Sequence, residues 1–134
     1  MKKKILIIGG APNSINSEII FKSWKKISNV TRKKIYLISN YDLINDQFKK
    51  LRFSIKLKKV VSINDESQNN NLKIIDVPIK FKNSFKVSKK NSSDLVLNSL
   101  KLAHKLCVRD KNILGIINCP IDKTLLKTNN MGVT

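Results

Sequence analysis

The stretch Lys4–Ile20 constrains the fold of this chain more than any other. Its run Ile5–Ile8 is short, continuous and apolar, which is typical of a strand buried on both faces of a sheet. Two glycines end the run, and Asn16 or Ser17 is then predicted to cap a helix, with Glu18 in its first turn. In open α/β sheets ligands bind at such strand ends, so this junction is a candidate site.

The rest of the chain continues the alternation of strands and helices. This order favours an α/β fold whose mainly parallel sheet is joined by crossover helices. Two polar segments, 62–71 and 83–93, are read as a loop and as an excursion from the core. Neither is a linker, so residues 1–134 are expected to lack an internal domain boundary. Helices are predicted over about 17–28, 42–51 and 93–109, and strands over 35–38, 53–58, 72–77 and 113–117.

The charge of the chain is strongly basic. It has 27 Lys and Arg against 9 Asp and Glu, a net charge of +18. Such a charge is compatible with a polyanionic partner, and a non-catalytic domain that binds nucleic acid is the alternative function. However, the lysines are spread over the whole chain, only three of the 27 basic residues are Arg, and aromatic residues make up 6%. We therefore interpret most of them as solvated lysines and do not expect nucleic acid as the partner.

The cysteine and histidine content indicates the compartment and limits the metal chemistry. Cys107 and Cys119 have no metal-ligand or disulfide-framework spacing, which indicates a reduced, cytoplasmic chain. The apolar run near the start is too short for a signal peptide, and no segment is long enough to cross a membrane. His104 is the only histidine, so it is expected to be a surface residue rather than a metal ligand.

A second strand end carries the other candidate residues. The segment Asn118–Lys123 follows the last predicted strand, and Pro120 suits the first position of a helix. Lys123 could neutralise a bound anion there, or it could be an ordinary solvated lysine. Cys119 could have a lowered thiol pKa beside a helix N-terminus, or it could be a small buried residue. The spacing of the residues favours a solvated Lys123 and a small buried Cys119.

These two junctions resemble motifs of the 4-hydroxythreonine-4-phosphate dehydrogenase (PdxA) family. Segment 10–19 is similar to the family sequence Gly-Asp-Pro-Ala-Gly-Ile-Gly-Pro-Glu-Ile, and it follows the first strand directly. Segment 118–123 is similar to the family's Thr-Gly/Ala-Pro-x-x-Lys turn, with Asn118 in place of Thr. The matching residues are Gly10, Pro12, Ile15, Glu18 and Ile19 in the first motif, and Pro120 and Lys123 in the second.

The resemblance implies a fold and an activity. The implied fold is an α/β/α sandwich akin to isocitrate and isopropylmalate dehydrogenases, present here only as an N-terminal portion. The implied reaction is an NAD-dependent oxidation of a phosphorylated hydroxy amino acid, 4-phosphooxy-threonine, followed by decarboxylation, in pyridoxal phosphate biosynthesis. A piece of such a fold is expected to leave apolar surface uncovered and to be inactive alone.

The resemblance also assigns residues and partners. It places Lys123 and Thr134 near the substrate, and it gives the loop residues Gly10, Pro12, Asn13, Ser14 and Glu18 the task of shaping the cleft. The segment 132–134 is either the family's substrate-binding Gly-His-Thr with Val133 in place of His, or the chain stops just before that motif. The complete family enzyme is expected to be a homodimer that uses NAD and a divalent metal, and the metal-binding histidines lie beyond these 134 residues.

Overall fold

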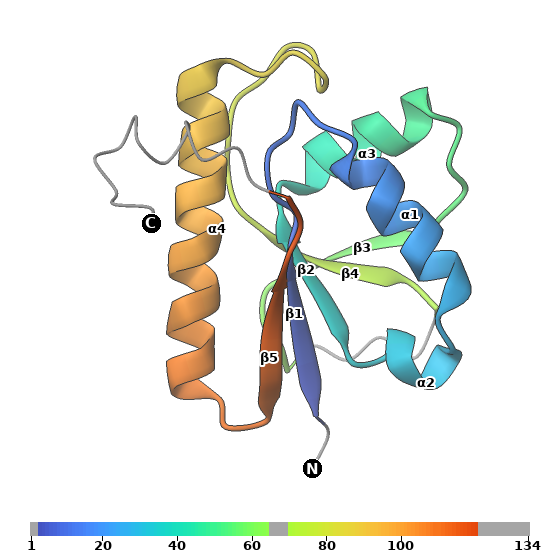
Figure 1. Cartoon of the computed structure of the whole chain (residues 1–134), viewed down its shortest axis with the longest axis vertical. Coiled ribbons are helices and arrows are strands. Elements are labelled where there is room, and N and C mark those ends of the chain that lie inside the picture. The colour runs from blue at the N-terminus through green and yellow to red at the C-terminus, as the bar shows by residue number, and fades with distance from the viewer. Residues whose placement is uncertain (1–2, 65–69, 121–134) are drawn as a thin grey trace.

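The computed structural model describes residues 3–64 and 70–120, which form one five-stranded sheet. The strands lie in the order β3-β4-β2-β1-β5, and every neighbouring pair is parallel. This arrangement confirms the α/β prediction (Figure 1). The strands are β1 (Lys4–Ile8), β2 (Ile35–Ser39), β3 (Leu57–Val60), β4 (Leu72–Asp76) and β5 (Ile113–Asn118).

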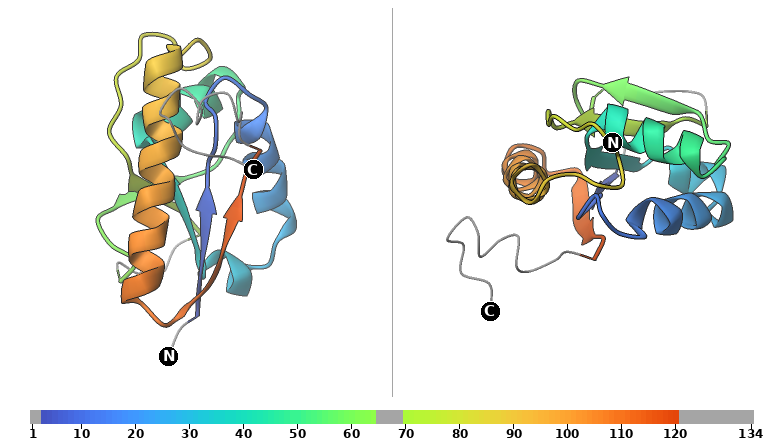
Figure 2. Two further views of the ribbon diagram at one scale, coloured as in Figure 1. Left: turned by 60° about the vertical axis from the view of Figure 1, so that its left-hand side comes forward. Right: turned by 90° about the horizontal axis from the view of Figure 1, so that it is seen from above.

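Helices cover both faces of the sheet and complete the predicted three-layer α/β/α arrangement. In the view from above, α4 lies on one side of the sheet, and α1 and α3 lie on the other (Figure 2). None of the helices in residues 3–64 and 70–120 has both the length and the apolar character needed to cross a bilayer. The helices are α1 (Asn16–Lys26), the short α2 (Asn29–Arg32), α3 (Tyr41–Lys50) and α4 (Lys89–Arg109).

Strand alternation divides the core into two clusters. On β1, Leu6 and Ile8 face the cluster under α4, whereas Ile5 and Ile7 face the cluster under α1 and α3. The first cluster includes Leu95 of α4, and the second is built on Ile20, Trp24, Ile44 and Phe48. These helices thus bury one apolar side each, whereas Leu51, at the C-terminal end of α3, is 39% exposed.

The third strand begins later than the alternating pattern predicted. The prediction over 53–58 is wrong, because β3 spans Leu57–Val60. Phe53 instead stacks on Phe21 with ring centroids 4.0 Å apart, and it meets Phe48 edge-on at 5.9 Å. Aromatic packing against α1 and α3 therefore holds the preceding segment off the sheet.

The strand β5 is less buried than its apolar sequence predicted. It lies at one edge of the sheet, and Leu114 and Ile117 are 60% and 55% exposed. An apolar run predicts burial on both faces, but within the described residues this strand has a neighbour on one side only. The predicted uncovered apolar surface is therefore present, and it lies on β5.

Candidate functional site

The two junctions singled out in the sequence meet at the carboxyl ends of β1 and β5. Ile8 at the end of β1 pairs with Asn118 at the end of β5, and the backbone N–H of Cys119 donates to the Ile8 carbonyl at 3.0 Å. The chain leaves β1 toward α1 on one face, and it reaches β5 from α4 on the other face (Figure 2). This is a topological switch point, the place where open α/β sheets bind their ligands.

Asn16 joins the two junctions directly. Its amide Nδ2 donates to the carbonyls of Gly9 at 3.1 Å and Pro120 at 2.8 Å. The prediction that Asn16 or Ser17 caps the helix is wrong, because both residues lie inside α1, and the preceding residue Ile15 makes no side-chain cap. Asn16 instead forms a hydrogen bond to Pro120, a residue 104 positions away in the sequence. A local sequence pattern cannot reveal such a contact.

The contact between Asn16 and Pro120 requires a glycine at position 10. Its φ is +75°, a conformation that residues with a side chain rarely adopt. A Cβ built at Gly10 would lie 2.5 Å from Nδ2 of Asn16 and 2.8 Å from the carbonyl oxygen of Pro120. The match of this glycine to the family motif therefore has a steric reason in the described structure.

Two buried polar atoms beside this contact have no hydrogen-bond partner. They are Oδ1 of Asn16 and Oγ of Ser17, and the two residues are only 2% and 3% exposed. Within residues 3–64 and 70–120, nothing satisfies these atoms. Buried polar atoms are normally bonded, so unpartnered ones at a switch point mark the start of α1 as a place for a polar ligand group.

The loop between β1 and α1 is held by two long-range anchors. Asn13 exchanges two hydrogen bonds of 2.8 Å with the backbone of Val87, and Nε2 of Gln47 donates to the carbonyls of Pro12 at 2.9 Å and Ser84 at 2.7 Å. These bonds fix the loop against α3 and against the segment before α4. They hold the backbone of this loop in a fixed conformation without a ligand.

The predicted excursion over 83–93 is therefore wrong. Ser84 is fully buried, Val87 is 5% exposed, and α4 already begins at Lys89 with Ser88 as its cap. Gln47 was not among the predicted site residues. It lies on the buried side of α3 beside Phe48, and a polar residue in such an apolar stripe is the signal that would have identified it.

The structure places two other candidate residues, Ser14 and Glu18. Ser14 donates its hydroxyl to the Ala11 carbonyl at 2.6 Å and closes the loop. The Glu18 carboxylate lies in the first turn of α1 and pairs with Lys22 of the same helix at 2.9 Å. Lys123 and Thr134 lie outside the described residues, as does the helix predicted to begin at Pro120.

Cys119 and His104 occupy the positions that the sequence favoured for them, a buried one and an exposed one. Cys119 is buried, and burial raises the pKa of its thiol, which is the opposite of an activated nucleophile. His104 is exposed on α4. The described residues contain no group of three or more His, Cys, Asp or Glu that could hold a metal ion. A divalent metal therefore has no ligand set in this part of the chain.

Comparison with known proteins places this geometry in a fold family. No family model and no curated protein matches the chain. Solved structures do match. The first, from Salmonella typhimurium and assigned as a 4-hydroxythreonine-4-phosphate dehydrogenase, has a TM-score of 0.82 and 20% identity, with 98% of this chain and 42% of that chain covered. The chain has the fold of part of a 4-hydroxythreonine-4-phosphate dehydrogenase.

Two more structures of 4-hydroxythreonine-4-phosphate dehydrogenases match over the same extent. The enzyme from Klebsiella pneumoniae has a TM-score of 0.76 and 19% identity, covering 95% of this chain and 40% of that one. The enzyme from Burkholderia phymatum has a TM-score of 0.77 and 15% identity, covering 96% and 39%. This chain thus spans about 40% of the length of the dehydrogenases that it matches, and the predicted resemblance is confirmed at the level of the fold.

Proposed function

We propose that this chain is the N-terminal part of an NAD-dependent dehydrogenase that oxidises 4-hydroxythreonine-4-phosphate or a closely related phosphorylated hydroxy amino acid. The observation that carries the proposal is the likeness in fold to three dehydrogenase structures over nearly the whole chain. The motif-bearing loop supports it, because that loop lies at the switch point of the sheet. The place of such a reaction is pyridoxal phosphate biosynthesis.

In this proposal the described residues shape one wall of the substrate cleft. The loop from Gly10 to Ser17 is anchored through Asn13 and Pro12, so its backbone presents a fixed surface to a ligand. The N-terminal end of α1 carries the positive end of the helix dipole, which favours an anionic group of the substrate. Lys123 would add a positive charge and Thr134 a hydroxyl near the same substrate.

NAD and a divalent metal are expected only for a longer protein. The described residues offer no metal ligand set, and Asn16 fills the space beside Gly10. In this proposal the metal ligands lie in other residues of the protein, outside the described ones. The same proposal includes a homodimer and a cytoplasmic location. Residues 1–134 would form part of one domain, without an internal boundary.

A binding experiment on the 134-residue chain tests the proposal. NMR titration with 4-hydroxythreonine-4-phosphate is expected to give saturable shifts of the amides of Gly9–Ser17 and 118–120. Ile15→Glu adds a negative charge to this loop at a side chain that is 66% exposed, so it should weaken binding several-fold. The matched control is Val61→Glu, at a loop position that is 92% exposed, and it should bind like the parent chain. Absence of saturable shifts at the loop would sink the proposal.

The net charge of +18 favours nucleic-acid binding as a second candidate function. Such binding would weaken steeply with added salt, since it rests on the release of counterions from phosphates. Fluorescence anisotropy with a labelled DNA or RNA duplex measures it directly. Negligible affinity at low salt would eliminate this alternative.

A further inference from the structure

A concave site lies at the amino ends of the strands, on the opposite side of the sheet from the carboxyl ends that form the switch point. It is a cavity of about 650 Å³ whose lining includes residues that lie one or two positions before three strands. Lys33 lies shortly before β2, Lys56 directly before β3, and Asn71 directly before β4. The cavity therefore opens at the amino ends of these strands, so the substrate cleft proposed above does not include it.

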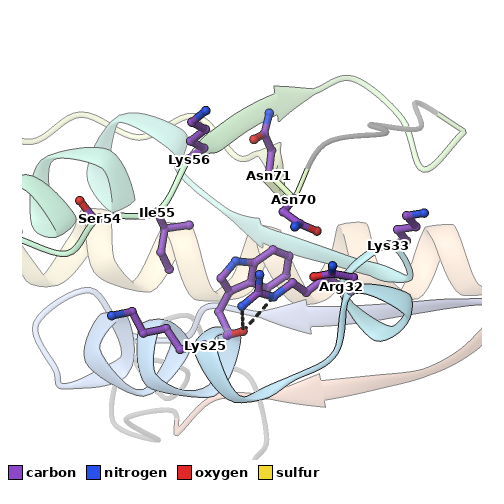
Figure 3. Close-up of a pocket in the computed structure, with 10 residues that line it drawn as sticks. Lys25, Arg32, Lys33, Ser54, Ile55, Lys56, Asn70 and Asn71 are labelled. Carbon is purple, nitrogen blue, oxygen red and sulfur yellow. Dashed lines mark hydrogen bonds between the residues drawn. The ribbon is translucent and has the colours of Figure 1, made fainter.

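Four basic side chains line this cavity, which we call the basic pocket. They are Lys25, Arg32, Lys33 and Lys56. They come from α1, α2, the turn after α2 and the segment before β3, and Figure 3 shows them around one space. None of the described residues that line it is acidic. Cations that converge on a concavity without a counter-charge focus a positive field into it.

Arg32 is held rigidly in this pocket. Its Nε and Nη2 both donate to the Trp24 carbonyl, at 3.0 and 2.8 Å, and its guanidinium lies 5.1 Å from the centre of the indole ring. The guanidinium has five N–H groups, so these two bonds leave three for a ligand. A planar fork that is already fixed loses little entropy on binding and suits phosphate oxygens.

The lysines of the pocket are less constrained. Lys25 lies over the ring of Phe21 at 4.7 Å, within reach of the cavity that it lines. In the described part of the chain, the ammonium groups of Lys33 and Lys56 form no ion pair. These charges are therefore not neutralised by the described protein.

We propose that the basic pocket binds a small ligand carrying two or more phosphate groups. Its volume lies in the range of ligand-binding cavities, roughly 300–1,000 Å³. Four cations exceed what a single carboxylate or phosphate needs, and they match the charge of a diphosphate. The occupant is thus of the nucleoside-diphosphate class rather than a monoanionic metabolite.

Isothermal titration calorimetry with inorganic pyrophosphate, at about 0.15 M ionic strength to screen exposed charges, tests this site. One ligand per chain is expected. The double variant Lys33→Gln/Lys56→Gln should lose at least about tenfold in affinity, a change of about 1.4 kcal/mol. The matched control Lys101→Gln/Lys105→Gln removes two exposed charges from α4 and should change affinity less than about twofold.

Three results would overturn the proposal. They are equal losses in the two double variants, no saturable binding of pyrophosphate, and binding of citrate as tight as that of pyrophosphate. Arg32→Lys keeps the charge but removes the planar fork, so weaker pyrophosphate binding is expected from it as well. Among the described residues, the side chains of Lys33 and Lys56 form no hydrogen bond or ion pair that holds the fold. The Lys33→Gln/Lys56→Gln variant therefore tests the proposal even where Arg32→Lys is poorly folded.

Discussion

At the scale of single residues, the candidate site depends on contacts that a local pattern cannot supply. The sequence predicted a helix start at Asn16 or Ser17 from residue type alone, and the helix does begin there. The role assigned to Asn16 was wrong, because its amide binds Pro120, which is remote in sequence. The cap of α3, by contrast, is a local contact, because a capping residue acts on its own helix: Oδ1 of Asn40 accepts from the N–H of Leu43 at 2.9 Å.

The bridge made by Asn16 should stabilise the fold. Asn16→Ala removes the hydrogen bond to Gly9 within the first junction and the hydrogen bond to Pro120 in the second, and we expect it to lower the free energy of unfolding by about 1–3 kcal/mol. Asn98→Ala makes the same substitution at an exposed position of α4 and corrects for helix propensity. Urea unfolding of both variants measures the difference. A loss no larger for Asn16→Ala than for Asn98→Ala would contradict the role of the bridge.

The two glycines Gly10 and Gly115 should respond in opposite ways to alanine. Gly10→Ala forces a Cβ onto Asn16 and into a positive-φ conformation, so a loss of more than about 1 kcal/mol is expected. Gly115 has open space around its Cβ position, and Gly115→Ala should be neutral or stabilising by up to about 1 kcal/mol. Thermal unfolding of the pair tests this, and equal effects would show that the loop does not need its glycine.

At the scale of elements, prediction succeeded where burial and periodicity agree. The positions of β1, β2, β4 and α4 were predicted closely, because each of these elements packs an apolar face against the core. It failed for β3, where Phe53 prefers an aromatic cluster, and for the exposure of β5. An apolar run reports that a strand is hydrophobic, but not how many neighbours it has in the sheet.

The exposed face of β5 should promote association of the chain. Leu114→Lys places a charge on this edge strand, at a side chain that is 60% exposed, and should shift sedimentation toward the monomer. Val61→Lys adds the same charge at an exposed loop position and should leave the distribution unchanged. A sedimentation profile of Leu114→Lys identical to that of the parent chain would contradict this prediction.

The ion pair between β1 and the end of α4 should make stability depend on acid. The backbone N–H of Asn112 holds the pKa of Asp110 below its ordinary value, and the Lys4 ammonium at 3.3 Å acts in the same direction. A lowered folded-state pKa means that this stabilisation is complete above the ordinary value of about 3.9 and is lost as the pH falls through the lowered one.

Asp110→Asn should therefore flatten the acid side of the stability profile. Urea unfolding between neutral and strongly acidic pH checks this, because the variant removes the titrating carboxylate. Asp94→Asn, at a half-buried carboxylate of α4 that forms no ion pair among the described residues, is the control and should keep the parent slope. An unchanged slope in Asp110→Asn would show that the contact contributes nothing to folding.

At the scale of the whole molecule, the three layers explain why two sites can coexist. The parallel sheet gives every strand the same direction, so its carboxyl edge gathers the Gly10 loop and the Cys119 turn. Its amino edge gathers the basic pocket. The motifs predicted the first site, since glycine and proline spacing is visible in sequence. The second site is lined by residues between Trp24 and Asn71 in the sequence, and only the fold brings them together.

The central claim, that these residues belong to a dehydrogenase, is tested most directly by enzyme assay. The complete reading frame that contains residues 1–134 would be expressed, and NADH formation followed with 4-hydroxythreonine-4-phosphate as substrate. The account predicts NADH formation that depends on this substrate and falls in the Ile15→Glu variant but not in Val61→Glu. A folded polypeptide from that complete frame that forms no NADH with this substrate would contradict it.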